Sequence, residues 1–138
     1  MGIHVRPASL RDGVAVLSLL EQVGYYPEPV SYAQTYRKTL TDPSFLVRVA
    51  EDEAGEIVGM ASLCLRNQLG IGGLVANLDE FAIRPGPDAS RAGRALRKAT
   101  VGKARALGAR RVVAEANQGT PPPRAAQLHA AAQLQKTA

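Results

Sequence analysis

The stretch Leu78–Leu96 reads LDEFAIRPGPDASRAGRAL and decides how the chain folds. Its first part mixes apolar and acidic side chains in alternation, which is typical of a β-strand. Pro85 and Gly86 then break the strand, and a basic helical segment opens at Gly93. This order places backbone N–H groups and the positive end of a helix dipole next to the end of a strand. We therefore expect an anionic ligand to bind at this junction.

Hydrophobic periodicity and turn residues predict the elements on either side of this stretch. Strands are expected over Ile3–Arg6, Phe45–Ala50, Ile57–Arg66, Leu74–Arg84 and Arg111–Ala116, and helices over Leu10–Val23, Val30–Leu40, Arg94–Leu107 and Arg124–Gln135. Ser9 is the expected N-cap of the first helix, with Asp12 as its acidic partner. The order β-α-α-β-β-β-α-β-α predicts an α/β (α+β) fold with a mixed, mostly antiparallel sheet and helices on both faces.

Length and composition predict one globular domain over residues 1–138. Aromatic residues make up only 4% of the chain, so the core must be aliphatic. No apolar run approaches the ~20 residues of a membrane span, so we expect no membrane association. The single cysteine excludes an intrachain disulfide, which favours a reducing, cytoplasmic location.

The net charge of +5 is concentrated in one part of the chain. From Arg84 to Arg111 there are nine basic residues against one acidic residue, Asp88, so an anionic partner should meet this segment. Nucleic acid is the less favoured partner, because the basic residues surround most of the helix and no aromatic residues lie between them. Two distant histidines and one cysteine give no pattern typical of a metal site.

Three segments, taken in order, resemble the GNAT superfamily of acyl-CoA-dependent N-acyltransferases. They are IHVRPASLRDGVAVLSLLEQ (3–22), FLVRVAEDEAGEIVGMASLCL (45–65) and LDEFAIRPGPDASRAGRAL (78–96), and the similarity extends from about Ile3 to His129. The resemblance implies a GNAT-like fold. It also implies an enzyme that transfers an acetyl group from acetyl-CoA to a primary amine of a small molecule or peptide, by direct attack.

The resemblance also implies which residues bind acetyl-CoA. The pantetheine arm and the acyl carbonyl would be held by backbone groups of the strand residues Phe81, Ala82 and Ile83. The pyrophosphate would be held by the amides that open the helix, those of Ala89, Ser90, Arg91, Ala92, Gly93 and Arg94. Asn117 matches a further family position. Family members carry R/Q-x-x-G-x-G/A in this loop. Here Asp88 replaces the Arg/Gln, Arg91 replaces the first glycine, and Gly93 is retained. An alternative is therefore a catalytically degenerate GNAT-like module that serves binding or interaction.

Glu80 is the expected general base, because an amine must lose a proton before it attacks and a partly buried carboxylate titrates closer to neutrality. The alternative is a solvated strand residue or an ion-pair partner of Arg84. Strand alternation predicts that Asp79 faces the opposite side, where its role would be structural. His129 is the expected proton donor to the leaving thiolate, the alternative being a surface histidine.

Four tyrosines flank or occupy the second predicted helix: Tyr25, Tyr26, Tyr32 and Tyr36. In the family this region lines the acceptor pocket, and packing of an amphipathic helix is the alternative role. The family usually continues into two further strands after the last helix, and we expect these to be missing here. The apolar edge of Arg111–Ala116 would then be covered by the terminal helix or by a second copy of the chain, as a homodimer.

Overall fold

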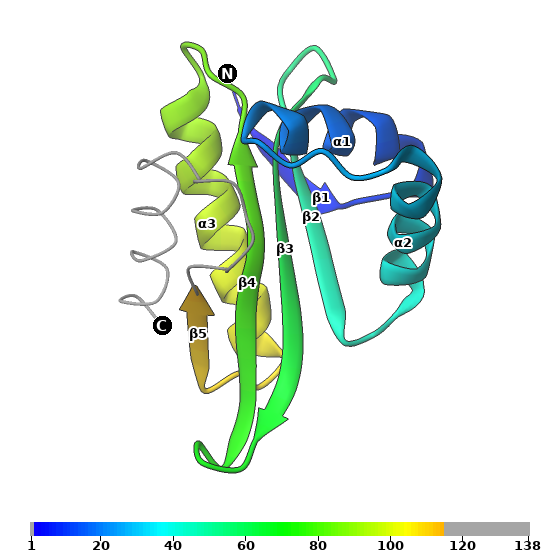
Figure 1. The fold of residues 1–138 in the computed structure, drawn as a ribbon. Helices are drawn as coiled ribbons and strands as arrows, with labels where there is room; N and C mark the ends of the chain where they lie inside the picture. Colours follow the sequence, from blue (N-terminus) through cyan, green and yellow to red (C-terminus); the bar gives the residue numbers. More distant parts are fainter. Residues whose placement is uncertain (1, 115–138) are drawn as a thin grey trace.

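The computed structural model describes residues 2–114, which form a five-stranded sheet with helices on both faces (Figure 1). The strands are β1 (His4–Pro7), β2 (Phe45–Glu51), β3 (Ile57–Gln68), β4 (Gly73–Ile83) and β5 (Arg111–Ala114). The helices are the 3-10 helix η1 (Leu10–Asp12), α1 (Gly13–Gln22), α2 (Pro29–Thr41) and α3 (Ala89–Ala106). The strands lie in the order β1-β2-β3-β4-β5, and all neighbours are antiparallel except β4 and β5. The predicted mixed, mostly antiparallel sheet is therefore confirmed.

The two faces of the sheet bury separate apolar clusters. The cluster under α3 includes Leu63, Leu78 and Leu96, and the cluster under α1 and α2 includes Val49 and Met60. Aliphatic side chains dominate both clusters, as the composition predicts. Strand β3 contributes to each cluster in turn and is buried on both faces from Val58 to Leu63.

The β2–β3 turn forms where the sequence predicts a hairpin. The Asp52 carboxylate accepts hydrogen bonds from the backbone N–H groups of Ala54 (3.0 Å) and Glu56 (2.9 Å). Gly55 lies between them with φ of +83°, a conformation that favours glycine. This turn connects β2 to β3 and sets the register in which the two strands pair.

Helix α3 begins at Ala89, five residues before the predicted start at Arg94, so that predicted boundary was wrong. The reason is that Gly86, with φ of +149°, ends the extended chain, and nothing after Pro87 opposes a helix. Asp88 is the N-cap residue, so the basic helix opens about one turn earlier than the glycine at position 93 indicates. The predicted helix Arg124–Gln135 and the end of the last predicted strand lie outside the described residues.

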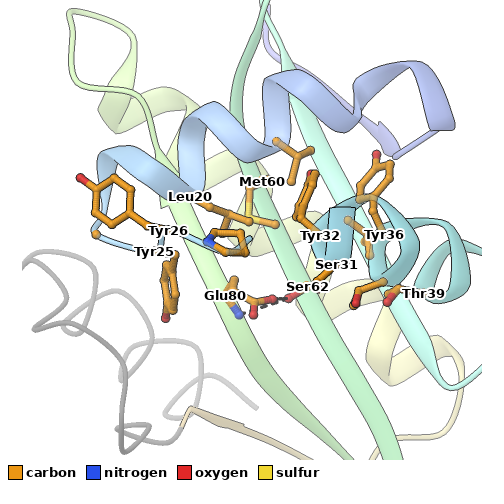
Figure 2. A pocket seen from close by; sticks show the side chains of 15 residues that line it. Leu20, Tyr25, Tyr26, Ser31, Tyr32, Tyr36, Thr39, Met60, Ser62 and Glu80 are labelled. Atoms are coloured by element: carbon orange, nitrogen blue, oxygen red, sulfur yellow. Dashed lines mark hydrogen bonds between the residues drawn. The ribbon is translucent and has the colours of Figure 1, made fainter. Parts of the chain in front are cut away.

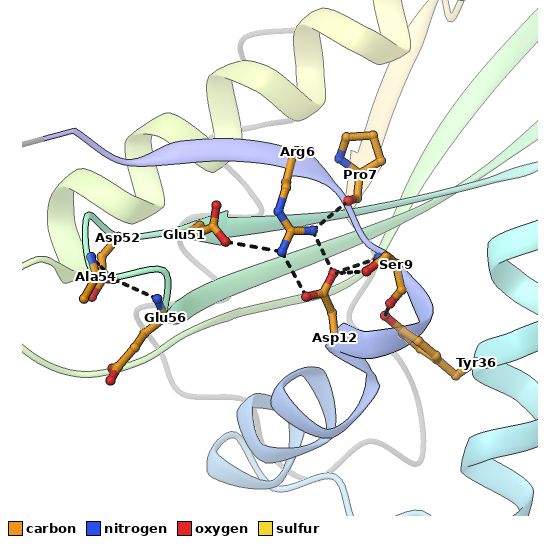
Figure 3. Close-up of polar contacts among 9 residues, drawn as sticks. All are labelled: Arg6, Pro7, Ser9, Asp12, Tyr36, Glu51, Asp52, Ala54 and Glu56. Carbon is orange, nitrogen blue, oxygen red and sulfur yellow. Dashed lines mark hydrogen bonds and ion pairs between the residues drawn. The ribbon is translucent and has the colours of Figure 1, made fainter.

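A buried ion pair fixes the start of α1 against β1 (Figure 3). Arg6 donates from Nη1 and Nη2 to the two carboxylate oxygens of Asp12, at 2.7 and 2.9 Å. Asp12 also accepts hydrogen bonds from the N–H (2.8 Å) and the hydroxyl (3.0 Å) of Ser9, which confirms the predicted pairing of these two residues. Asp12 is only 4% exposed, and the hydrogen bonds from Arg6 lower its pKa to about 2.

Candidate functional site

A cavity of about 630 Å³ lies between the α1–α2 layer and the sheet (Figure 2). Its walls come from α1, the loop that follows, α2, and the facing positions of β2, β3 and β4: Val16, Leu20, Gly24, Tyr25, Tyr26, Pro27, Ser31, Tyr32, Thr35, Tyr36, Thr39, Val47, Met60, Ser62 and Glu80. All four predicted tyrosines line it. The alternative role also holds in part, since Tyr36 is buried in the core under α2.

Tyr32 and Tyr36 form the aromatic wall of the cavity on α2. Their rings stack with centroids 5.7 Å apart, as expected for residues four apart on one helix face. The Tyr32 hydroxyl donates to the carbonyl of Gly13 (2.6 Å), and the Tyr36 hydroxyl donates to the carbonyl of Ser9 (2.7 Å). Both rings are thus fixed against the start of α1, and their hydroxyl protons are already used.

A β-bulge in β4 brings Glu80 to the floor of the cavity. Ser62 pairs with Glu80 while its neighbour Leu63 pairs with Leu78, so Asp79 is the extra residue. The bulge shifts the alternation of side chains, because Leu78 and Phe81 both pack in the cluster under α3. Without the bulge these two side chains would lie on opposite faces.

Asp79 is the bulged residue, so strand alternation does not fix the face on which its side chain lies. Alternation places Asp79 on the face opposite Glu80, but the pKa of the cavity residue Tyr25 is raised by burial and then by the charges of both Glu80 and Asp79. Asp79 therefore adds its charge to the surroundings of the cavity. The structural role expected for Asp79 stays a prediction.

Ser62 is the hydrogen-bond partner of Glu80 (Figure 2). The Ser62 hydroxyl donates to Oε1 of Glu80 and accepts from the Glu80 N–H at 3.2 Å. Burial raises the pKa of Glu80, and the Ser62 hydrogen bond opposes that rise. The predicted alternative of an ion pair with Arg84 is wrong, because Arg84 pairs instead with Glu56 (2.8 Å) and Asp52 (3.7 Å).

Beyond the bulge, β4 presents backbone to the side on which β5 lies. In the described part of the chain β5 pairs with β4 only over Val75–Leu78. Phe81 is buried under α3, and Ala82 is buried under α1 and α2. Since these side chains point to the two faces, the strand edge offers peptide N–H and C=O groups, the kind of group that binds an extended ligand.

The N-terminus of α3 follows β4 directly and carries the predicted anion-binding amides. The N–H of Ala89 donates to the carbonyl of Gly86 (3.1 Å) and that of Ala92 to the carbonyl of Asp88 (2.9 Å), whereas the N–H of Ser90 has no backbone acceptor among residues 2–114. Arg91 is paired with Asp88, and both side chains are partly exposed. The pair partly neutralises the one acidic group at the positive end of this helix.

The family model described as the acetyltransferase (GNAT) family matches residues 13–127. The chain belongs to the GNAT family. Solved structures agree with this fold. A transcriptional regulator from Bacillus halodurans C-125 matches with 20% identity over 96% of this chain and 91% of its own, at a TM-score of 0.75. Glucosamine-6-phosphate N-acetyltransferase from Arabidopsis thaliana matches with 13% identity over 85% and 84%, at 0.72.

A predicted acetyltransferase with acetyl-CoA from Clostridium acetobutylicum also shares the GNAT fold, with 13% identity over 87% of this chain and 84% of its own and a TM-score of 0.67. At these identities the structural neighbours establish the fold alone. A search of curated protein sequences found no significant match.

The described residues of this GNAT chain fit the cofactor that the family uses. An exposed backbone edge and a helix N-terminus, in that order along the chain, suit an extended arm that ends in a diphosphate. The Asp88 charge opposes a diphosphate, and the Arg91 guanidinium beside it offsets that charge. Gly93 does not need to be glycine for packing, since the nearest atom to a Cβ there, in Ile83, would lie 4.0 Å away.

Two predicted site residues, Asn117 and His129, lie outside the described residues. Ser62 was missed by sequence reasoning, although a hydroxyl within the apolar run of β3 is a usable signal because a buried polar group needs a partner. Within residues 2–114 no group of three His, Cys, Asp or Glu side chains could hold a metal ion. No helix in that range is long and apolar enough to cross a membrane.

Proposed function

We propose that the protein transfers an acetyl group from acetyl-CoA to a primary amine bound in the cavity beneath α1 and α2. The observation that carries this proposal is the placement of Glu80. Its carboxylate lies on the cavity floor, at the bulge from which β4 runs on toward the N-terminus of α3. One side chain thus adjoins both the space for an amine and the backbone proposed to hold the acetyl donor.

Acetyl-CoA, when bound, supplies an activated acetyl thioester. We assign its binding to backbone groups of Phe81, Ala82 and Ile83 and to the amides of the first turns of α3, with Asn117 as a further contact. The strand edge orients an extended arm by peptide hydrogen bonds. The helix N-terminus stabilises negative charge by its dipole and its N–H groups.

Glu80 acts as the general base. A protonated alkylamine has no lone pair for attack, so a carboxylate oxygen of Glu80 first takes a proton from its nitrogen. Burial raises the pKa of Glu80 toward that of the amine, which makes this transfer less unfavourable. The neutral nitrogen then attacks the acetyl carbonyl directly, without a covalent enzyme intermediate, and gives up its second proton to solvent as the carbon–sulfur bond breaks. The imidazole of His129 is the proposed donor of a proton to the leaving sulfur.

Thermal unfolding with added acetyl-CoA tests this function. A ligand that binds only the native state stabilises it by ~2.7 kcal/mol at 100 times its Kd. We expect an upward shift of Tm with acetyl-CoA, and mass-spectrometric detection of an N-acetylated amine when an acceptor is added. An unchanged Tm at millimolar acetyl-CoA would contradict the proposal.

The Asp88–Arg91 pair favours a second candidate, a GNAT-like module without catalysis. Both residues occupy positions where the family motif differs, and a side chain at position 91 restricts the approach of a diphosphate to the backbone. The substitution Arg91→Gly separates the two candidates. If it creates CoA binding that the natural chain lacks, the module is correct; if the natural chain already binds CoA, the transferase is favoured.

A cytoplasmic location and a homodimer remain proposals as well. The first rests on the single cysteine, and the second on the apolar strand β5, which lies at one edge of the sheet formed by residues 2–114.

A further inference from the structure

The cavity beneath α1 and α2 is aromatic and aliphatic over most of its wall. Of the described residues that line it, Glu80 alone carries a charge, and none is Lys, Arg or His. Its volume of about 630 Å³ is within the usual range of small-molecule sites. A buried apolar wall favours ligands with an apolar body, because such ligands remove hydrophobic surface from water.

The hydroxyl groups of the wall are not arranged to bind a polar ligand deep in the cavity. The hydroxyl protons of Tyr32 and Tyr36 are donated to backbone carbonyls near α1, so these residues offer mainly ring surface. The hydroxyl-bearing side chains of α2, at positions 31, 35 and 39, follow one helix face, and two of the three residues are exposed. These three hydroxyl groups could bind a polar substituent at the mouth of the cavity, whereas the interior accommodates apolar groups.

The charges around the cavity favour a ligand that carries a single positive charge. Glu80 and the neighbouring Asp79 both act on Tyr25, so the field at the floor is negative. An anionic substituent would find no basic side chain among the described lining residues. A polyamine would place its second ammonium group against aromatic carbon with no further carboxylate in the wall. A single ammonium group would find its counter-charge in Glu80.

We infer that the acceptor is a primary monoamine carried on an aromatic or bulky apolar group, as in an arylalkylamine. Its ammonium group would lie at Glu80, and its ring would lie among Tyr25, Tyr32, Leu20 and Met60. This inference rests on the proposed function, because it assigns the acceptor of the proposed reaction. It excludes phosphorylated amino sugars and polyamines as preferred acceptors.

Fluorescence anisotropy of tryptamine tests the inference. The chain contains no tryptophan, so indole emission reports the ligand alone. The titration is run with and without CoA, and binding in either condition counts. We expect tryptamine to bind and to be displaced by phenethylamine. Indole-3-propionate, with a carboxylate in place of the ammonium group, should neither bind nor compete, and spermidine and glucosamine 6-phosphate should compete weakly.

Two variants locate the binding site. Glu80→Gln should weaken tryptamine binding by about tenfold to a hundredfold, because it removes the charge that the ammonium group faces. Glu21→Gln, which removes an exposed carboxylate of α1, is the matched control and should leave the affinity unchanged. Tyr25→Ala should weaken binding by about threefold to tenfold, through loss of ring surface.

The outcomes separate this inference from the proposed function. Glu80-dependent binding of tryptamine without acetyl transfer would support the ligand class inferred for the cavity and contradict the transferase. Acetylation of spermidine or glucosamine 6-phosphate in preference to tryptamine would overturn the inference and leave the transferase standing. Equal affinity for tryptamine and indole-3-propionate, or no tryptamine binding in either condition, would also overturn the inference.

Discussion

The properties of Glu80 follow from two opposing contributions to one side chain. Burial against β3 and the α1–α2 layer disfavours the charged carboxylate and raises its pKa, while the Ser62 hydroxyl stabilises the charged form and lowers it. A general base works best when it is unprotonated at the operating pH and still basic enough to accept a proton. We interpret the hydrogen bond between Ser62 and Glu80 as the contact that limits the rise in the pKa of Glu80.

Ser62→Ala should move the acidic limb of the pH profile. The base acts when unprotonated, so kcat/KM rises with pH through the pKa of Glu80 in the free enzyme. Removing the hydrogen bond that Ser62 donates takes away a stabiliser of the carboxylate, so this pKa rises and the limb shifts to higher pH. The measurement is kcat/KM against pH for both proteins.

Ser18→Ala, an exposed serine of α1, is the control for that profile and should leave the limb in place. A limb that moves to lower pH in Ser62→Ala, or does not move, would contradict the role given to Ser62.

Asp12→Asn should lower stability in a pH-dependent way. The pKa of Asp12 is lowered from 3.8 to about 2, so its ion pair with Arg6 stabilises the fold above about pH 4, and that contribution is lost as pH falls through about 2. Asp12→Asn should therefore cost about 2 kcal/mol at neutral pH and remove part of the acid dependence. Urea unfolding at several pH values measures both effects. A variant with wild-type stability at pH 7 would show that the pair contributes nothing net.

At the residue scale, the candidate site residues could be predicted from the sequence, but most of their contacts could not. Glu80 and the four tyrosines could be chosen from their positions relative to predicted elements. The partner of Glu80 could not, because Arg84 lies nearer in sequence and Ser62 becomes a neighbour only when β3 and β4 pair. The bulge at Asp79 was not predicted for a related reason, since a bulge depends on cross-strand register that local alternation does not contain.

At the scale of elements, the junction of β4 and α3 carries the cofactor hypothesis. Asp88 is the N-cap residue but makes no capping hydrogen bond, and its carboxylate pairs with Arg91 instead. An acidic side chain at this position is favourable to the helix dipole and unfavourable to a bound diphosphate. The charge of Asp88 therefore stabilises α3 but would weaken the proposed binding of CoA.

Asp88→Asn should tighten acetyl-CoA binding. Asparagine is as good an N-cap residue as aspartate, so the helix is preserved while a negative charge is removed and Arg91 is released toward the phosphates. A single charge near a helix terminus is worth ~0.3–1 kcal/mol, which corresponds to a gain of about two- to fivefold in affinity. Isothermal titration calorimetry measures this gain, with Glu21→Gln as the control for net charge. Weaker binding in Asp88→Asn would show that the carboxylate helps to hold the cofactor.

The elements themselves were predicted well where periodicity was strong, as in β3 and in α1. The start of α3 was placed five residues late because the glycine and basic residues were weighted above the absence of any helix breaker after Pro87. Short-range sequence signals identify elements, whereas their ends are less well determined by local sequence.

At the scale of the whole molecule, the order of elements was sufficient to predict the sheet. A central hairpin gives antiparallel neighbours, and one β-α-β crossover gives the parallel pair β4–β5. The cavity was not predictable in the same way. It exists because α1 and α2 are held above the sheet by long-range contacts, including those of Tyr32 and Tyr36 with the start of α1.

Acetyl transfer by the natural protein and by Glu80→Gln, with acetyl-CoA and phenethylamine, tests the central claim most directly. Mass spectrometry of the N-acetylated amine is the readout. We expect product with the natural protein and a rate at least ~100-fold lower with Glu80→Gln, the usual contribution of a general base, while both proteins bind acetyl-CoA alike. Equal rates for the two proteins would contradict that claim.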